Sequence, residues 1–164
     1  MGQLGVLFAI DEATVAKLQA ATGDDDAVRE VIEEVEEAWD KATLAETDKA
    51  WDAMHRALTN GDLEWSNGEY PLNHVILGGR SLYEGDEYIA VLKTPDQVRD
   101  VAAAVRSIDD EAMGGLYDRN VAPGYDANYG DVDRAYTVDW FSGVRELFMA
   151  AADSGRWVLF TVDQ

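Results

Sequence analysis

The chain has 164 residues, of which 47% are hydrophobic, and it carries no cysteine and a formal net charge of −20 at pH 7. This length and apolar content suit a single domain with one core, spanning residues 1–164. The lack of cysteine excludes disulfides, thiolate metal sites and cysteine nucleophiles, and it fits a reducing cytoplasm. The negative charge disfavours binding to nucleic acids and anionic membranes, since both repel it.

Three interpretations of this charge stay open: solubility, recognition of a basic protein partner, and adaptation to high salt. No stretch approaches the roughly 20 consecutive apolar residues of a membrane helix. The first ten residues also lack the basic start and the cleavage site of a signal peptide. The sequence therefore predicts a cytoplasmic protein with no membrane segment.

The first half of the chain predicts one strand followed by helices. Residues 3–10 form a short apolar run, which is typical of a buried strand. Asp11 is placed to cap a helix that ends at Gly23. A second helix is expected over 26–41, and a third over 47–59 ends at Asn60-Gly61. The apolar face of the second helix holds Val28, Val31, Ile32, Val35 and Trp39.

The middle of the chain predicts a loop, a short helix and a second strand. Residues 60–70 are expected to be a loop, and Pro71 begins a short helix that Gly78-Gly79 ends. Tyr88 to Leu92 predicts a strand. Thr94-Pro95-Asp96-Gln97 then combines a capping threonine, a first-turn proline and a capping-box glutamine, which indicates a helix N-terminus.

The last third predicts further helices and a closing strand. A helix is expected from Asp110 to Tyr117, a long polar loop over 119–131, a helix over 132–153 and a strand from Trp157 to Val162. Runs of helices between few strands are typical of the α+β class. We therefore predict a single α+β domain with a three- or four-stranded sheet packed against about six helices.

The helix faces also predict which large side chains are buried. Trp51 and Phe148 lie on the apolar stripes of two separate helices, so both are expected in the core. His55 lies on the same stripe as Trp51, which indicates a structural histidine with satisfied polar atoms. A general base or metal ligand at His55, helped by Asp52, is the alternative interpretation.

No sequence motif assigns a metal or a cofactor. The acidic stretch beginning at Asp126 lacks the glycine and glutamate that a calcium loop needs at positions six and twelve. Gly78-Gly79-Arg80-Ser81 lacks the lysine and glycine spacing of a phosphate-binding loop.

Aromatic residues in the predicted loops are the clearest candidates for binding. Amphipathic aromatics are enriched at interaction surfaces, although lids over a core are also built from them. The candidate binding residues are Trp51, Asp52, His55, Trp65, Tyr70, Tyr125 and Tyr129.

Several segments together resemble one bacterial family. Asp48 to Thr59, with Trp51 and His55 in a Trp-x-x-x-His helix, and Pro71 to Gly79 are similar to segments of the YfbM-like family, domain of unknown function 1877. The Met-Gly start, the strand-Thr-Pro-helix at 88–105 and the closing helix-Gly-strand also fit. The resemblance implies a soluble bacterial α+β domain, and it supplies no catalytic residues to carry over.

Two functional hypotheses follow from these observations. The first is a non-enzymatic binding domain that recognises a basic protein or a small ligand through an acidic surface and aromatic loops. The second is a hydrolase-like or metal-dependent enzyme centred on His55 and nearby carboxylates. The oligomeric state is left open.

Overall fold

A computed structural model describes residues 3–124 and 130–163 of the chain. The strands are β1 (Gly5–Ile10), β2 (Leu44–Asp48), β3 (Arg80–Ser81), β4 (Tyr88–Lys93) and β5 (Trp157–Asp163). The α-helices are α1 (Glu12–Ala21), α2 (Asp25–Ala38), α3 (Trp51–Leu58), α4 (Pro95–Val105), α5 (Asp110–Asn120) and α6 (Gly130–Ser154). Three short 3-10 helices are η1 (Lys41–Thr43), η2 (Leu72–His74) and η3 (Ala122–Gly124).

The strands form one antiparallel sheet in the order β2-β1-β5-β4-β3. The α+β class and the six α-helices in the described ranges confirm the predicted fold, but the sheet has five strands rather than three or four. The two additional strands are β2 and β3. Both are short, and β3 has only two residues.

Strand β2 also corrects the predicted start of the third helix. The helix expected over 47–59 begins at Trp51, because Leu44–Asp48 pairs with β1 instead. The register shifts by one residue opposite Gly5 and Val6, so Thr47 forms a bulge. The buried Thr47 hydroxyl donates to the Gly5 carbonyl at 2.8 Å, which satisfies both polar groups at the bulge.

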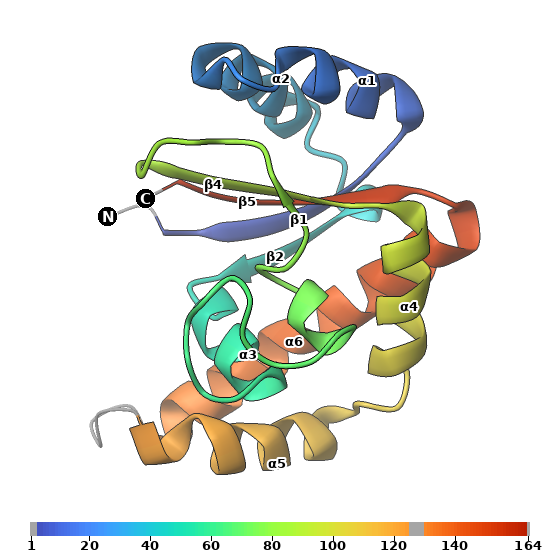
Figure 1. Ribbon diagram of the computed structural model, residues 1–164. Coiled ribbons are helices and arrows are strands. Elements are labelled where there is room, and N and C mark those ends of the chain that lie inside the picture. The colour runs from blue at the N-terminus through green and yellow to red at the C-terminus, as the bar shows by residue number, and fades with distance from the viewer. Residues whose placement is uncertain (1–2, 125–129, 164) are drawn as a thin grey trace.

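The helices cover both faces of the sheet, so the fold has three layers (Figure 1). Helices α1 and α2 pack on one face over a smaller core that includes Phe8, Leu18 and Ile32. Helices α3, α4, α5 and α6 lie on the opposite side, where a larger core includes Phe148 and Phe160. The predicted burial of Trp51 and Phe148 is confirmed, with exposed fractions of 6% and 0%.

The helix ends follow their local sequence. The Asp11 carboxylate accepts from the Thr14 N–H at 2.9 Å, and Thr94 forms the predicted capping box with Gln97. The helix predicted over 26–41 ends at Ala38, because Asp40 caps the separate 3-10 turn η1. Trp39, which was expected on the buried face, therefore lies beyond the helix and is 39% exposed.

The remaining boundaries differ little from the prediction. The turn after Pro71 is the 3-10 helix η2 rather than an α-helix, and α5 extends to Asn120 into the predicted loop. No helix within residues 3–124 and 130–163 is long and apolar enough to cross a membrane.

Candidate functional site

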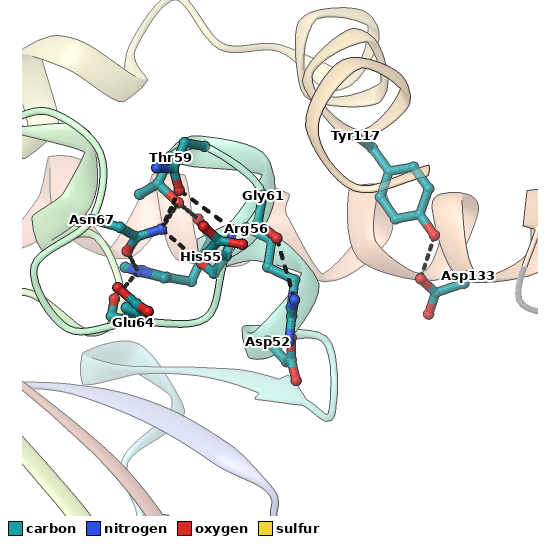
Figure 2. A network of polar contacts seen from close by, with 11 residues as sticks. Asp52, His55, Arg56, Thr59, Gly61, Glu64, Asn67, Tyr117 and Asp133 are labelled. Atoms are coloured by element: carbon teal, nitrogen blue, oxygen red, sulfur yellow. Dashed lines mark hydrogen bonds and ion pairs between the residues drawn. The ribbon is translucent and has the colours of Figure 1, made fainter. Parts of the chain in front are cut away.

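His55 lies at the centre of a polar network that ties the loop after α3 to the helix (Figure 2). Its Nε2 lies 2.8 Å from the Glu64 carbonyl and 2.8 Å from Asn67 Oδ1. The Asn67 amide donates to Thr59 Oγ1, Asn60 Oδ1 and the Asp62 carbonyl, which orients Oδ1 towards His55. The network therefore replaces the backbone pairing that this loop lacks.

The surroundings of His55 favour a neutral ring. Both neighbours of Nε2 are acceptors, so Nε2 carries the proton and Nδ1 is left with a lone pair. Nδ1 is buried and has no hydrogen-bond partner in the described chain. Burial lowers the pKa of His55, the contacts with Asn67 and Glu64 oppose that effect, and the charge of Lys93 adds to it.

The carboxylate nearest to His55 in sequence is engaged elsewhere. Asp52 pairs with Arg56 Nε at 2.6 Å, one helical turn along α3, and Arg56 also donates to the Gly61 carbonyl (Figure 2). Among the described residues there is no group of three or more histidine, cysteine, aspartate or glutamate side chains placed to hold a metal ion. The network thus joins α3 to its following loop.

Lys93 is the buried ionisable residue that sequence reasoning missed. Its side chain has no exposed surface, and its Nζ donates to the Ile76 carbonyl and lies 5.3 Å from the centre of the Phe160 ring. Burial lowers its pKa well below the usual value for lysine. The signal was available, because Lys93 alternates with Ile89 and Val91 and so points into the larger core.

Trp51 is part of the core, although it was a binding candidate. Its ring packs on Phe160 with centroids 5.9 Å apart, and its indole N–H donates to the Gln3 carbonyl at 2.9 Å. A side chain at Gly5 would lie within 2.8 Å of the indole, so glycine is required for this close approach. Through this hydrogen bond, Trp51 connects the residue Gln3, just before β1, to α3.

The aromatic candidates of the loop before η2 are exposed. Trp65 is 48% exposed and lines a hollow of about 710 Å³ together with Tyr83. Tyr70 is 49% exposed, and its hydroxyl donates to Asp100, which raises the pKa of Tyr70 to about 12. Two further candidates, Tyr125 and Tyr129, lie outside the described residues, as does Asp126.

A second hollow lies between α2 and one end of the sheet, and we call it the α2 hollow. Its volume is about 310 Å³. Four residues spaced along α2 and its end form one wall, and the ends of β1, β2, β4 and β5 form the other. The α2 wall consists of Arg29, Glu33, Glu36 and Trp39. Exposed Leu4 and Trp39 give this hollow an apolar rim.

The α2 hollow is strongly acidic. Five carboxylates line it against one cation, Arg29, whose guanidinium lies 5.7 Å from the centre of the Tyr88 ring. The carboxylates are those of Glu33, Glu36, Glu46, Asp48 and Asp163. Tyr88 donates to Glu36 at 2.8 Å, so the tyrosine ring and the carboxylate hold each other in place.

One residue with an unusual backbone conformation lies at the same place. Asp48, the last residue of β2, has a φ of 51°, which a residue other than glycine rarely adopts. The bulge at Thr47 precedes it, and the Tyr136 hydroxyl from α6 donates to its carboxylate. Strained residues and bulges gather at functional sites, so this corner of the sheet is the strongest geometric candidate.

Comparison with known proteins agrees with this fold. A family model described as "Domain of unknown function (DUF1877)" matches residues 1–161. The chain belongs to this family. The crystal structure of YfbM from Escherichia coli, a protein of unknown function, is similar, with a TM-score of 0.66 and 17% sequence identity. The match covers 97% of this chain and 99% of that one.

The DUF1877 family assignment confirms the resemblance seen in the sequence, and the structural match supports the fold alone. No functionally curated protein matches the chain. The function is therefore inferred from the geometry of the site.

Proposed function

We propose that this protein is a non-enzymatic binding domain that recognises a basic partner protein through the α2 hollow. Trp65 also lines a hollow, but only two carboxylates, Glu84 and Asp86, accompany it there. The α2 hollow has five carboxylates, an exposed tryptophan and the strained Asp48. Carboxylates beside aromatic rings suit lysine and arginine side chains, which the rings bind through cation–π contacts.

The main support for this proposal is the distribution of acidic residues along α2. Helix α2 contains seven acidic residues and one basic residue, and its last turn has no basic residue. Glu36 and Glu37 face the negative end of the helix dipole, and Glu33 repels both of them along the helix surface. Glu33 and Glu36, which line the hollow, are thus disfavoured by the electrostatics of the helix, and retention of costly groups is typical of functional sites.

The net charge of −20 supports the same proposal. A field of this sign steers cationic partners towards the protein and raises the association rate at low salt. A small cationic ligand would use the same contacts. We place this interaction in the bacterial cytoplasm, in agreement with the absence of cysteine and the resemblance to YfbM.

A charge-matched pair of variants tests the proposal. Glu33→Gln with Glu36→Gln removes two carboxylates from the hollow, whereas Glu30→Gln with Glu37→Gln removes two from the same helix outside it. Calorimetric titration with an alternating lysine–valine decapeptide should show the first variant binding at least about tenfold more weakly. The second should stay within about threefold of the wild type.

Two results would contradict the proposal. Failure of the wild type to bind any cationic probe, or equal weakening of decapeptide binding in both variants, would overturn the α2 hollow as a site. A glutamate–valine decapeptide serves as the ligand control and should not bind.

The enzymatic alternative centred on His55 has a separate test. His55 is buried, and it lines neither the α2 hollow nor the hollow beside Trp65. Metal analysis of the purified protein and a generic hydrolase screen, each repeated on His55→Ala, would reveal such an activity. Stoichiometric metal or turnover that disappears in His55→Ala would favour the enzyme over the binding domain.

A further inference from the structure

Strand β2 is the end strand of the sheet. Strand β1 pairs with one of its edges, and no other strand in the described ranges pairs with the opposite edge. An end strand offers a row of backbone N–H and C=O groups to any extended chain that approaches it. Peptide recognition by strand addition uses edges of this kind.

A groove of about 490 Å³ lies between β2 and α6, and we call it the β2–α6 groove. Small residues on both sides, including Ala45 of β2 and Gly143 of α6, leave room in it. Its length suits an extended chain: Asp139 and Ala150 lie about 16 Å apart along α6, and five strand residues span about 17 Å. Glu46 of β2 lines both this groove and the α2 hollow.

The two hollows flank β2: Glu46 and Asp48 line the α2 hollow, and Leu44, Ala45 and Glu46 line the β2–α6 groove. Ala45 points into the larger core under α6, whereas Leu44 packs on the smaller core under α2. Side chains of a strand alternate between the two faces of its sheet. A chain added to β2 would therefore direct alternate side chains towards the α2 hollow and the β2–α6 groove.

The charge of the β2–α6 groove indicates which kind of chain would bind in it. Three carboxylates, those of Glu46, Asp139 and Glu146, line it against one cation, Lys41. Trp140 in this groove and Trp39 in the α2 hollow provide an aromatic surface on each side of β2. A second copy of this chain would bring Glu46 and its neighbours against the same negative charges, so a basic chain fits better.

We infer that β2 binds an extended basic segment of a partner protein as an added strand, with alternate side chains in the α2 hollow and the β2–α6 groove. This inference rests on the proposed function and adds the conformation of the partner and a second contact surface. Backbone pairing supplies affinity, and the two acidic hollows supply the preference for lysine and arginine.

The ligand experiment separates backbone pairing from charge attraction. The alternating lysine–valine decapeptide is compared by calorimetry with the same peptide N-methylated at its central residues, which keeps the charge and removes the N–H donors. We expect the methylated peptide to bind at least about tenfold more weakly. In the wild type, the unmethylated peptide should slow hydrogen exchange of those amides of Leu44–Glu46 that do not pair with β1.

Two glycine variants test the groove. An added Cβ at Gly143 of α6 or at Gly115 of α5 meets no atom within 4 Å, so leucine is expected to fold at both positions. Gly143→Leu fills the groove and should weaken the decapeptide at least about tenfold, whereas Gly115→Leu should leave binding unchanged. Spermidine, which has no peptide backbone, should bind both variants like the wild type.

The outcomes distinguish this inference from the proposed function. Equal affinity for the methylated and unmethylated peptides, or an unaffected Gly143→Leu, would overturn strand addition and leave the α2 hollow as a charge-based site. Binding of spermidine but not of the decapeptide would also overturn strand addition. Dimerisation of the protein without peptide, if Gly143→Leu blocked it, would overturn strand addition too. Failure of every cationic probe to bind would overturn the proposed function itself.

Discussion

The face of the sheet under α3, α4 and α6 buries His55 and Lys93 away from solvent, whereas the face under α1 and α2 keeps its carboxylates at the rim of an open hollow. The pKa values of His55 and Lys93 fall because burial penalises their charged forms. The carboxylates of the α2 hollow are mostly solvated. The ionisable groups of the first face are therefore shielded from solvent, whereas most carboxylates of the α2 hollow are exposed to it.

The largest expected effect comes from the larger core. Phe148→Ala should lower the free energy of unfolding by about 3–5 kcal/mol, because the fully buried ring leaves a cavity. Urea unfolding followed by circular dichroism measures this loss. Val132→Ala on the same helix is the control, since Val132 is 83% exposed and should change stability by less than about 0.5 kcal/mol. Similar values for the two variants would contradict the assignment of the core.

Lys93→Met should stabilise the protein at pH 7, by about 1–3 kcal/mol, because an apolar side chain replaces a buried amine. The folded pKa of Lys93 is lowered, so below the unfolded pKa of about 10.4 the unfolded chain binds the proton more readily. Wild-type stability therefore increases as the pH rises towards that value, and the advantage of the variant shrinks.

Urea unfolding at pH 7 and near pH 10 measures the effect of Lys93→Met. Lys17→Met is the control, since the Lys17 side chain is 62% exposed. An unchanged or lower stability of Lys93→Met at pH 7 would show that the bond to the Ile76 carbonyl outweighs the burial of the amine.

The smallest expected effect concerns the acidic face. Glu36→Gln with Glu37→Gln should raise the Tm by a few degrees, roughly 1 kcal/mol, because both carboxylates face the negative end of α2 and a glutamine amide oxygen can still accept the bond from Tyr88. Asp110→Asn with Glu111→Gln should lower it, since these two residues favour the N-terminal turn of α5. Thermal melts at low salt and in about 0.5 M sodium chloride should show both differences shrinking. Equal shifts of one sign would contradict the role of helix position.

The parts of the fold that were predictable from sequence are those with local physical causes. Asp11, Thr94 and Gln97 cap helices through bonds to residues three positions away, so their pattern is visible in the sequence. Strand β2 is different, because Leu-Ala-Glu-Thr-Asp has no strong strand pattern and becomes a strand by pairing with β1. Its identity depends on residues some 40 positions earlier.

The candidate site was predictable only in its chemistry. Negative charge and aromatic residues are visible in the sequence, but the periodicity places Trp39 on a buried helix face because it does not reveal the end of α2 at Ala38. The position of Asp48 is set by the bulge at Thr47 and by the hydrogen bond from Tyr136, 88 positions further along the chain. Long-range contacts of this kind leave no local pattern.

The place of β5 in the sheet has a consequence for how the chain folds. This strand lies between β1 and β4, so before residues 157–163 are in place the sheet consists of two separate strand pairs, β2-β1 and β4-β3. An isolated pair of strands is marginally stable in water. During synthesis the native sheet therefore closes late, after α6 has emerged, and the high sequence separation of the β1–β5 contacts slows that step. Until then the apolar faces of β1 and β4 are open to chaperones and to aggregation.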